Sequence, residues 1–396
     1  MKRRLYLSLA AISLLLIAAV RARSARRPAY GGTLQMEIGA VVNSLDPAVG
    51  AANAQEAEAK AEIDSLIYEH RNPDGTFAGV SGSGPFHISG WDPGKHATLA
   101  ANDDFPAGRP FVDSIDIQMG RSVHDRLLDL EVSNTDLAEI PAAQARQAAI
   151  NGVRISASQP DRLLALVFLA GRAPVQDQRL RQALSESIDR SAIVDFILQK
   201  EGLPAGSLLP QWSSGTAYLF STTADAVAAK ALVAQIGASP AFVLGYDSGD
   251  PFEESVAERI AVNAHAAGLA VNVQALPAGS SAGSPGLPDA RLIRLPMPSP
   301  QPQASLQSFL ATLVPLAGLD PVQLPDPASA GQIYSVEQKV VGGYRVVPLV
   351  WYPQVFGLST RLRDWQSPGP GEALPLADVW LDGPGNDLSL SEKESP

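Results

Sequence analysis

Residues 242–276 read FVLGYDSGDPFEESVAERIAVNAHAAGLAVNVQAL. Both ends of this stretch are short apolar runs, which are typical of strands, and Pro251–Gly268 between them has the composition of a helix. A strand, a helix and a second strand in this order pair the two strands in parallel through a right-handed crossover. The stretch therefore predicts an α/β fold.

The same kinds of element continue on the N-terminal side. Leu34, Met36 and Ile38 recur at every second residue, which predicts a strand within 31–42. Further elements are expected as strands at 84–88 and 113–119 and as an amphipathic helix at 51–68.

A helix is also predicted within 175–202, because Leu180, Leu184 and Ile188 recur every four residues and form one apolar stripe. Asp189 is placed to cap a second short helix. The charged residues of the first helix then fall on its solvated side: Arg179, Arg181 and Glu186. No aromatic or basic cluster accompanies these arginines, so a packed helix is favoured over one that binds nucleic acid.

Composition limits the possible partners. The chain has 396 residues, 45% of them hydrophobic and 18% charged, which is enough for a sizeable core and two lobes. Its net charge is −11, and after residue 24 it carries 25 basic and 41 acidic residues. A body this acidic repels phosphate backbones, so no nucleic-acid partner is expected. Since cysteine is absent, disulfides, thiolate nucleophiles and the lipid-attachment site of a lipoprotein are excluded.

Residues 1–24 have the pattern of an export signal. A basic start is followed by the uncharged apolar run Leu5–Val20, which is short for a membrane span, and Ala22 and Ser24 have the spacing of a signal-peptidase site. We expect a signal peptide, with an uncleaved N-terminal membrane anchor as the alternative. Either segment places the body of the protein outside the cytoplasm, in the periplasm or its equivalent.

Catalytic and metal-binding patterns are weak. Gly279–Gly283 fits the G-x-S-x-G pattern of serine hydrolases, but the prolines that follow make the required helix unfavourable. The five histidines are scattered, and only His87 and His96 flank one turn. We therefore expect no enzyme, no catalytic residues, no cofactor and no metal site.

Residues rich in proline, glycine and serine predict irregular segments. These are expected at 277–305 and 315–331, with a helix at 306–313 between them, and in a fraying tail from Ser367 onward. None of the irregular segments is expected to contribute to a hydrophobic core.

The order of several short motifs resembles one family. These motifs are Gly31-Gly32-Thr33-Leu34, Ser44-Leu45-Asp46-Pro47, Gly82-Ser83-Gly84-Pro85-Phe86, the segment Pro174–Arg190, and Val347-Pro348-Leu349. In this order they are similar to the extracytoplasmic solute-binding proteins of peptide and nickel ABC transporters, family 5. The series covers most of the chain after residue 30, although no single motif is specific.

The resemblance implies a two-lobed, periplasmic-binding-protein-like fold of type II, with mixed sheets and hinge crossover strands. Lobe I would comprise residues 30–164 and 346–396 and lobe II residues 165–345. The crossing strands would lie around Leu163–Leu169 and Arg345–Tyr352. The small domain that the family inserts before its glycine-rich strand has only Arg71–Ser81 in its place, so a shortened member is expected.

The resemblance also implies a ligand site in the cleft between the lobes. The candidate ligand-binding residues are Trp212, Tyr246, Arg294, Trp351 and Tyr352. For the aromatic residues ordinary core packing is the alternative, and for Arg294 it is an exposed loop position. In peptide-binding members an aspartate in a loop that also contains tryptophan holds the ligand's amino group, and the equivalent residues 291–305 contain neither tryptophan nor aspartate.

These features predict the substrate-binding component of an ABC transporter. It would act as a monomer that captures a small molecule or peptide and delivers it to permease subunits in the membrane. The alternative is a non-transport structural or interaction protein of the cell envelope derived from the same fold.

Overall fold

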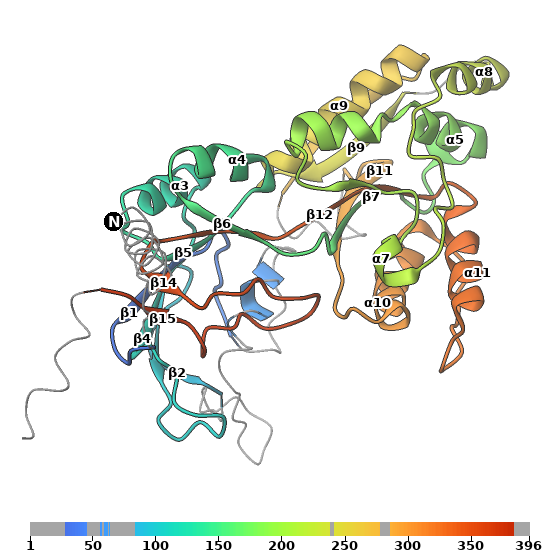
Figure 1. Cartoon of the computed structure of the whole chain (residues 1–396). Helices are drawn as coiled ribbons and strands as arrows, with labels where there is room; N and C mark the ends of the chain where they lie inside the picture. Colours follow the sequence, from blue (N-terminus) through green and yellow to red (C-terminus); the bar gives the residue numbers. More distant parts are fainter. Residues whose placement is uncertain are drawn as a thin grey trace, which may run out of the picture.

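The structure is a computed structural model that describes residues 28–45, 56–57, 59–61, 63, 84–237, 241–277 and 286–383. Within these residues the chain forms two large β-sheets, each with parallel and antiparallel pairs, together with helices that cover them (Figure 1). The predicted α/β class with mixed sheets is confirmed.

The first sheet has the strand order β2-β3-β4-β1-β5-β13-β6. Its strands are β1 (Thr33–Glu37), β2 (Phe86–Asp92), β3 (His96–Ala101), β4 (Ser114–Gln118), β5 (Leu137–Ile140), β6 (Arg154–Ala157) and β13 (Val355–Leu358). Strand β1 lies parallel to β4 and β5, whereas the other neighbours are antiparallel. Leu34, Met36 and Ile38 are all buried, as their period of two predicts.

Two helices pack on one face of the first sheet. Helix α3 (Val123–Glu131) contacts β5 and β13, and α4 (Ala142–Ile150) contacts β6 and β13. Both helices follow short connections from a strand of the sheet, α3 after β4 and α4 after β5. The N-terminal ends of both helices therefore lie at the edge where those strands end.

The second sheet has the order β10-β9-β11-β7-β12-β8. Its strands are β7 (Arg162–Phe168), β8 (Leu203–Pro204), β9 (Phe242–Asp247), β10 (Val271–Leu276), β11 (Ala290–Pro296) and β12 (Val346–Tyr352). Strands β9 and β10 are parallel and are joined by helix α9 (Pro251–Ala267). The strand, helix and strand predicted for residues 242–276 are confirmed.

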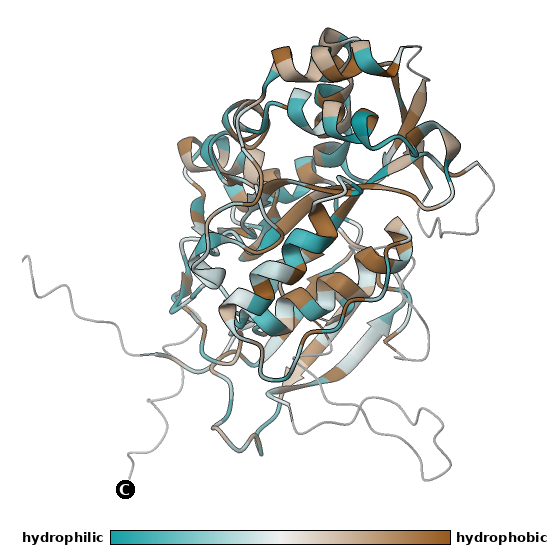
Figure 2. Cartoon of the chain, turned by 90° about the vertical axis from the view of Figure 1, so that its right-hand side faces the viewer, coloured by the Kyte–Doolittle hydropathy of each residue, from teal (hydrophilic) through white to brown (hydrophobic). Residues whose placement is uncertain are grey.

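Helices cover both faces of the second sheet (Figures 1 and 2). Helices α5 (Gln178–Ser187), α8 (Ala226–Ile236) and α9 pack together on one face, and α10 (Pro302–Ala317) and α11 (Ala330–Val341) on the other. The remaining helical pieces are η1 (Ala173–Val175), α6 (Arg190–Ala192), η2 (Ile193–Ile197) and α7 (Gln211–Ser214). Figure 2 shows helices that alternate between brown and teal, as expected for amphipathic helices on a sheet.

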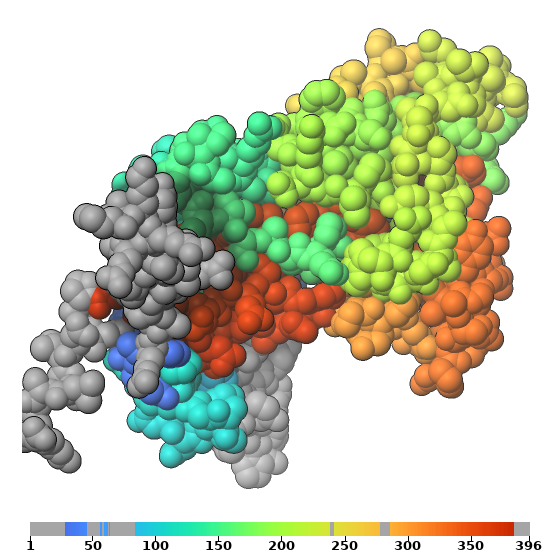
Figure 3. Space-filling model, in the orientation of Figure 1, coloured from blue at the N-terminus to red at the C-terminus, as the bar shows by residue number. Residues whose placement is uncertain are grey.

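The chain passes between the two sheets twice, at residues 158–161 and 353–354. The two connections are hydrogen-bonded to each other: Ser158 N donates to Gln354 O at 2.9 Å, and Gln354 N donates to Ser158 Oγ at 3.0 Å. The predicted crossing strands correspond to β7 and β12, which pair antiparallel in the second sheet. In the space-filling view the red C-terminal segment runs across the middle of the molecule (Figure 3).

The prediction for the 175–202 stretch is correct for its apolar stripe and wrong for one arginine. Leu180, Leu184 and Ile188 are fully buried, and the Asp189 side chain caps α6. Arg181, however, is 5% exposed instead of solvated. Its guanidinium donates hydrogen bonds to the carbonyls of Val175, Gln176 and Gly343, which satisfy the buried charge without a carboxylate.

Two segments predicted to be irregular contribute to the core. Residues 290–296 form β11, because hydrogen bonds to β7 and β9 hold both of its edges. In the tail after Ser367, Leu376 and Val379 are fully buried and Trp380 pairs with Arg363 in a small sheet of β14 (Leu362–Arg363) and β15 (Trp380–Leu381). Local composition predicts neither segment, because both lie among prolines and their partner strands are distant in the sequence. The helix at 306–313 is confirmed within α10.

Several predictions fall on residues outside the described part of the chain. These are the export segment 1–24, the shortened stretch 71–81 and the Gly279–Gly283 motif. Of the helix predicted at 51–68, the described residues between 56 and 63 are helical. Among the helices of the described residues, none combines the length and apolar character needed to cross a membrane.

Candidate functional site

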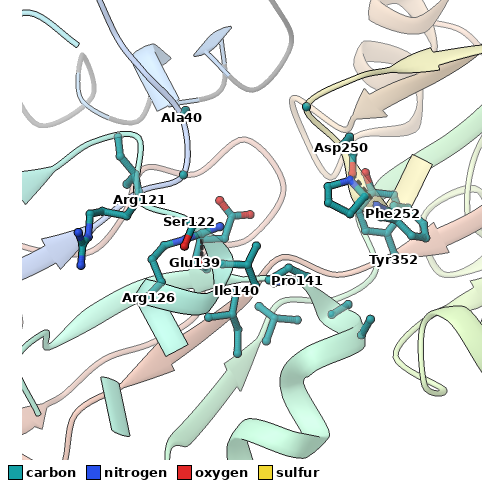
Figure 4. Close-up of a pocket in the computed structure, with 18 of the residues that line it drawn as sticks. Ala40, Arg121, Ser122, Arg126, Glu139, Ile140, Pro141, Asp250, Phe252 and Tyr352 are labelled. Atoms are coloured by element: carbon teal, nitrogen blue, oxygen red, sulfur yellow. Dashed lines mark hydrogen bonds between the residues drawn. The ribbon is translucent and has the colours of Figure 1, made fainter. Parts of the chain in front are cut away.

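A cavity of about 420 Å³ lies between the two sheets. Its volume is within the range of small-molecule sites. It has two walls (Figure 4). The first wall belongs to the first sheet and its helices and comprises Ile38, Gly39, Ala40, Ala59, Gly120, Arg121, Ser122, Val123, Arg126, Glu139, Ile140, Pro141, Ala142 and Ala143. The second wall comprises Arg162, Leu198, Gly249, Asp250, Pro251, Phe252, Arg294 and Tyr352. The lining is completed by Pro353 in the connection between the sheets and by Val355, the first residue of β13.

The first wall is built from the N-terminal ends of α3 and α4. Ser122 is the N-cap of α3, and its hydroxyl accepts a hydrogen bond from Asp125 N at 3.1 Å. Helix α4 begins after Pro141, which has no side chain able to cap it, and Ala142 and Ala143 line the cavity. Because the first N–H groups of a helix have no partner within the helix, this wall presents positive dipole ends to the cavity.

Arg126 is the buried cation of the first wall. Its side chain extends from α3, it is 8% exposed, and its Nη1 donates to the carbonyl of Glu139. Its Nε has no hydrogen-bond partner among the described residues. No carboxylate oxygen in the described part of the chain lies within 4.0 Å of its guanidinium. Burial lowers the pKa of Arg126, although Glu139 and Glu37 oppose the shift.

Arg121 differs from Arg126 although both line the same wall. It forms ion pairs with Glu37 at 3.3 Å and with Asp129 at 2.5 Å, and it is turned away from the other labelled side chains in Figure 4. Burial raises the pKa of the Glu37 carboxyl, which Arg121 partly offsets. The charge of Arg121 is therefore already balanced by carboxylates of its own wall.

Charges in the second wall form a closed network. The Asp250 carboxylate caps α9 by accepting hydrogen bonds from Phe252 N at 3.0 Å and Glu253 N at 3.3 Å. Arg294 forms ion pairs with Asp250 at 2.9 Å and with Glu253 at 3.3 Å. Burial, reinforced by Asp250 and opposed by Arg294, raises the pKa of Glu253 to about 7. One guanidinium therefore pairs with two carboxylates in this network, and the second carboxylate, that of Glu253, is the one that holds a proton more readily.

The apolar part of the second wall is aromatic. The rings of Phe252 and Tyr352 meet edge to face, with centroids 5.1 Å apart, and Leu198 lies beside them in the lining. Tyr352 is 7% exposed and also belongs to the hydrophobic core. A ligand in the cavity would meet a flat apolar surface on this side.

One ion pair joins the two sheets at the cavity. Arg162, the first residue of β7, lies 3.0 Å from the carboxylate of Glu139 in β5. The Glu139 side chain is 35% exposed, so the pair is only partly buried. The contact connects the walls next to the chain crossings.

The structure brings two of the five predicted site residues together. Arg294 and Tyr352 line the cavity, and Arg294 is a residue of β11 with a side chain that is 11% exposed, not an exposed loop charge. Trp351 is fully buried near Phe309 on the opposite face of the second sheet.

The other two candidates lie outside the lining. Trp212 is 39% exposed in α7 and donates to Pro160 O, while Tyr246 donates to Glu254 beside α9. The sequence analysis did not identify Arg126 or Phe252 as site residues. A signal existed for Phe252, because the adjacent Asp250 and Pro251 are typical of the start of a helix.

The described residues contain no group of three or more histidine, aspartate or glutamate side chains placed to hold a metal ion. His96 is hydrogen-bonded to Asp116 across β3 and β4, and His87 lies on β2. The cavity lining contains no histidine.

Known proteins similar to this chain are solute-binding proteins. The family model for "Bacterial extracellular solute-binding proteins, family 5 Middle" matches residues 42–312. The chain is 29% identical over 125 residues to the oligopeptide-binding protein AppA of Bacillus subtilis (strain 168), which covers 31% of this chain and 22% of AppA. It is 25% identical over 201 residues to the probable D,D-dipeptide-binding periplasmic protein DdpA of Escherichia coli (strain K12), covering 50% of this chain and 39% of DdpA.

A solved structure shares the fold over nearly the whole chain. AgaA from A. tumefaciens R10, in complex with agropinic acid, superposes with a TM-score of 0.69 at 14% identity, covering 90% of this chain and 100% of AgaA. The matches to the two curated relatives span less than half of their length. The family model, in contrast, matches more than half of this chain. The chain belongs to the bacterial extracellular solute-binding proteins, family 5.

Proposed function

We propose that this protein is the substrate-binding component of an ABC transporter of the peptide or nickel type. It captures a small solute, peptide-like or related, in the cavity between its two sheets and delivers it to permease subunits in the membrane. The observation that carries the proposal is the cavity itself, since residues of both sheets line it. Membership in a family of binding proteins confirms the expectation that the chain is not an enzyme.

The two sheets with their helices act as lobes in this proposal. The boundaries lie at the connections 158–161 and 353–354, because the chain passes between the sheets there and both β7 and β12 belong to the second sheet. Rotation about these short connections opens and closes the cavity, and the ligand stabilises the closed form by touching both walls. Permease recognition of the closed form couples capture to transport.

The site residues of the proposal come from both walls. Arg294 holds Asp250 in place, and Phe252 and Tyr352 contact the apolar part of the ligand. Relatives support a small ligand, because DdpA is described as a probable D,D-dipeptide-binding protein and the AgaA structure contains agropinic acid. A dipeptide-sized compound also suits a cavity of about 420 Å³.

The same comparisons support a location outside the cytoplasm. DdpA is named a periplasmic protein, and the family is described as extracellular. We propose that this chain likewise works outside the cytoplasm, carried there by residues 1–24.

A thermal-shift screen tests the proposal. The panel contains dipeptides, amino acids, sugars and metal chelates, and a ligand present at a hundred times its Kd should add about 2.7 kcal/mol to the free energy of unfolding. Ala143→Trp, which fills the cavity from α4, should abolish the shift, whereas Gln147→Trp on the exposed side of the same helix should preserve it. If no compound shifts the wild type, the structural envelope protein becomes the better explanation.

A further inference from the structure

The second wall contains a complete carboxylate site, occupied by the protein's own Asp250. That carboxylate accepts two N–H groups at the start of α9 and forms an ion pair with Arg294 at 2.9 Å. A helix N-terminus and a guanidinium together form the usual surroundings of a buried carboxylate.

The first wall offers the same two kinds of donor, and the carboxylate in its lining, that of Glu139, is ion-paired with Arg162. Helix α4 starts without a side-chain cap, and its residues Ala142 and Ala143 line the cavity. Arg126 lines the cavity next to them, since its guanidinium reaches the carbonyl of Glu139, three residues before Ala142 (Figure 4).

The nearby acidic residues are ion-paired with other arginines. Glu139 forms its ion pair with Arg162 at 3.0 Å and Glu37 with Arg121 at 3.3 Å. Arg126 as a residue is 8% exposed, and its Nε lacks a hydrogen-bond partner in the part of the chain that the structure describes. An uncompensated buried charge is unfavourable, and a ligand anion would relieve this penalty on binding.

We propose that the solute of this cavity carries a carboxylate, which binds between Arg126 and the N-terminus of α4, while its apolar body packs against Phe252 and Tyr352. The inference rests on the proposed function and adds the chemical class of the ligand. Gly39 contributes by leaving room, because a Cβ at this position would lie 2.8 Å from Nη2 of Arg126. The ligand carboxylate thus does in the first wall what Asp250 does in the second.

Matched pairs of compounds test this inference by isothermal titration calorimetry. Each pair consists of a carboxylate and its carboxamide, for example N-acetyl-L-phenylalanine with its amide and L-alanyl-L-phenylalanine with its amide. The carboxylate of a pair should bind at least tenfold more tightly than the amide. Arg126→Gln should abolish this preference, and Arg126→Lys should retain part of it, because a lysine keeps the charge and loses the two-pronged geometry.

The matched control is Arg146→Gln, an exposed arginine on α4, which should leave both affinities unchanged. Circular dichroism and the Tm of each variant verify that it is folded. Equal affinity for carboxylate and amide, or a preference that survives Arg126→Gln, overturns the inference and leaves the proposed solute receptor intact. Failure of every compound in both this panel and the broader screen overturns the proposed function and the inference with it.

Discussion

The two walls of the cavity contain similar groups in different states of compensation. In the second wall the Asp250 carboxylate accepts hydrogen bonds at the start of α9 and forms an ion pair with Arg294. In the first wall no carboxylate of the described residues lies within 4.0 Å of the Arg126 guanidinium, and the Glu139 carboxylate in the lining is ion-paired with Arg162. In our proposal, the carboxylate that pairs with Arg294 comes from the folded chain itself, whereas the carboxylate that pairs with Arg126 comes from the ligand.

This contrast has a consequence for stability and for binding. Groups that compensate one another in the folded protein contribute mainly to stability, and their removal leaves a buried charge. A group that awaits an outside partner contributes mainly to affinity. Substitutions in the two walls should therefore affect different measurements.

The largest effect is expected from Arg294→Met. The substitution leaves Asp250 and Glu253 buried without their cation, so the free energy of unfolding should fall by about 3–5 kcal/mol. Urea denaturation at pH 8, where Glu253 is ionised, measures this change in the free energy of unfolding. Arg146→Met, on the exposed side of α4, is the control and should stay within about 0.5 kcal/mol of the wild type. A small effect of Arg294→Met would remove the distinction between the walls.

The next effect is a pH dependence from Glu253. Its pKa rises from 4.5 to about 7 on folding, so between these values the folded state binds more protons than the unfolded state. Stability should therefore fall as the pH rises from about 4.5 to 7, by on the order of 3 kcal/mol from this group, and then stay level. Denaturation of Glu253→Gln across this range should show a shallower decline than the wild type.

The control for this pH series is Glu254→Gln, an exposed neighbour in α9. Its decline should match that of the wild type. Part of the decline should remain in Glu253→Gln, because burial also raises the pKa of Glu337 to about 7 on the other side of the second sheet. If Glu253→Gln declines as steeply as the wild type, the carboxyl is already ionised at low pH and the network is tighter than we infer.

A smaller effect, on affinity, is expected from Gly39→Ala. The added methyl group would lie 2.8 Å from the guanidinium of Arg126 and should displace it from the first wall. Carboxylate affinity should fall several-fold, roughly 1 kcal/mol, since the charge remains but its position changes. Calorimetry with the matched carboxylate and amide measures the affinity of the variant and of the wild type for each compound. Gly331→Ala, where a Cβ has no neighbour within 4 Å, provides a glycine control. A loss shared equally by the amide would point to a general distortion of the cavity.

The smallest effect is expected from Arg126→Met on the stability of the unliganded protein. The substitution loses the hydrogen bond to Glu139 O but also removes a buried, uncompensated charge, so the free energy of unfolding should change by less than about 1 kcal/mol. Urea denaturation without ligand measures it beside Arg294→Met. A loss of stability as large as that of Arg294→Met would show that Arg126, like Arg294, mainly stabilises the folded protein.

Strand geometry explains why Tyr352 lines the cavity and Trp351 does not. Trp351 and Tyr352 are adjacent in β12, and adjacent residues of a strand point to opposite faces. Tyr352 therefore reaches the cavity, whereas Trp351 packs near Phe309 in the core. The sequence showed two large rings side by side, but only the position of β12 between β7 and β8 decides which face meets the ligand.

Buried arginines were the least predictable feature. Arg181 lies on the predicted polar side of a helical pattern, and Arg294 lies in a proline-rich region, yet Arg181 is buried and the Arg294 side chain is only 11% exposed. Their partners, such as the carbonyl of Gly343 and the carboxylate of Asp250, come from distant parts of the chain. A local pattern contains no information on such partners.

The sequence by itself determined the α/β class, the apolar stripes of the main strands and helices, and the parallel unit of β9, α9 and β10. These properties follow from periods of two and of three to four residues, which are set by backbone geometry alone. Only the tertiary structure decided that Arg126 lies opposite Phe252 across a cavity, and that Asp250 is compensated while Arg126 is not. Compensation of a buried charge depends on which distant segments fold against it, and this is settled when the sheets pack.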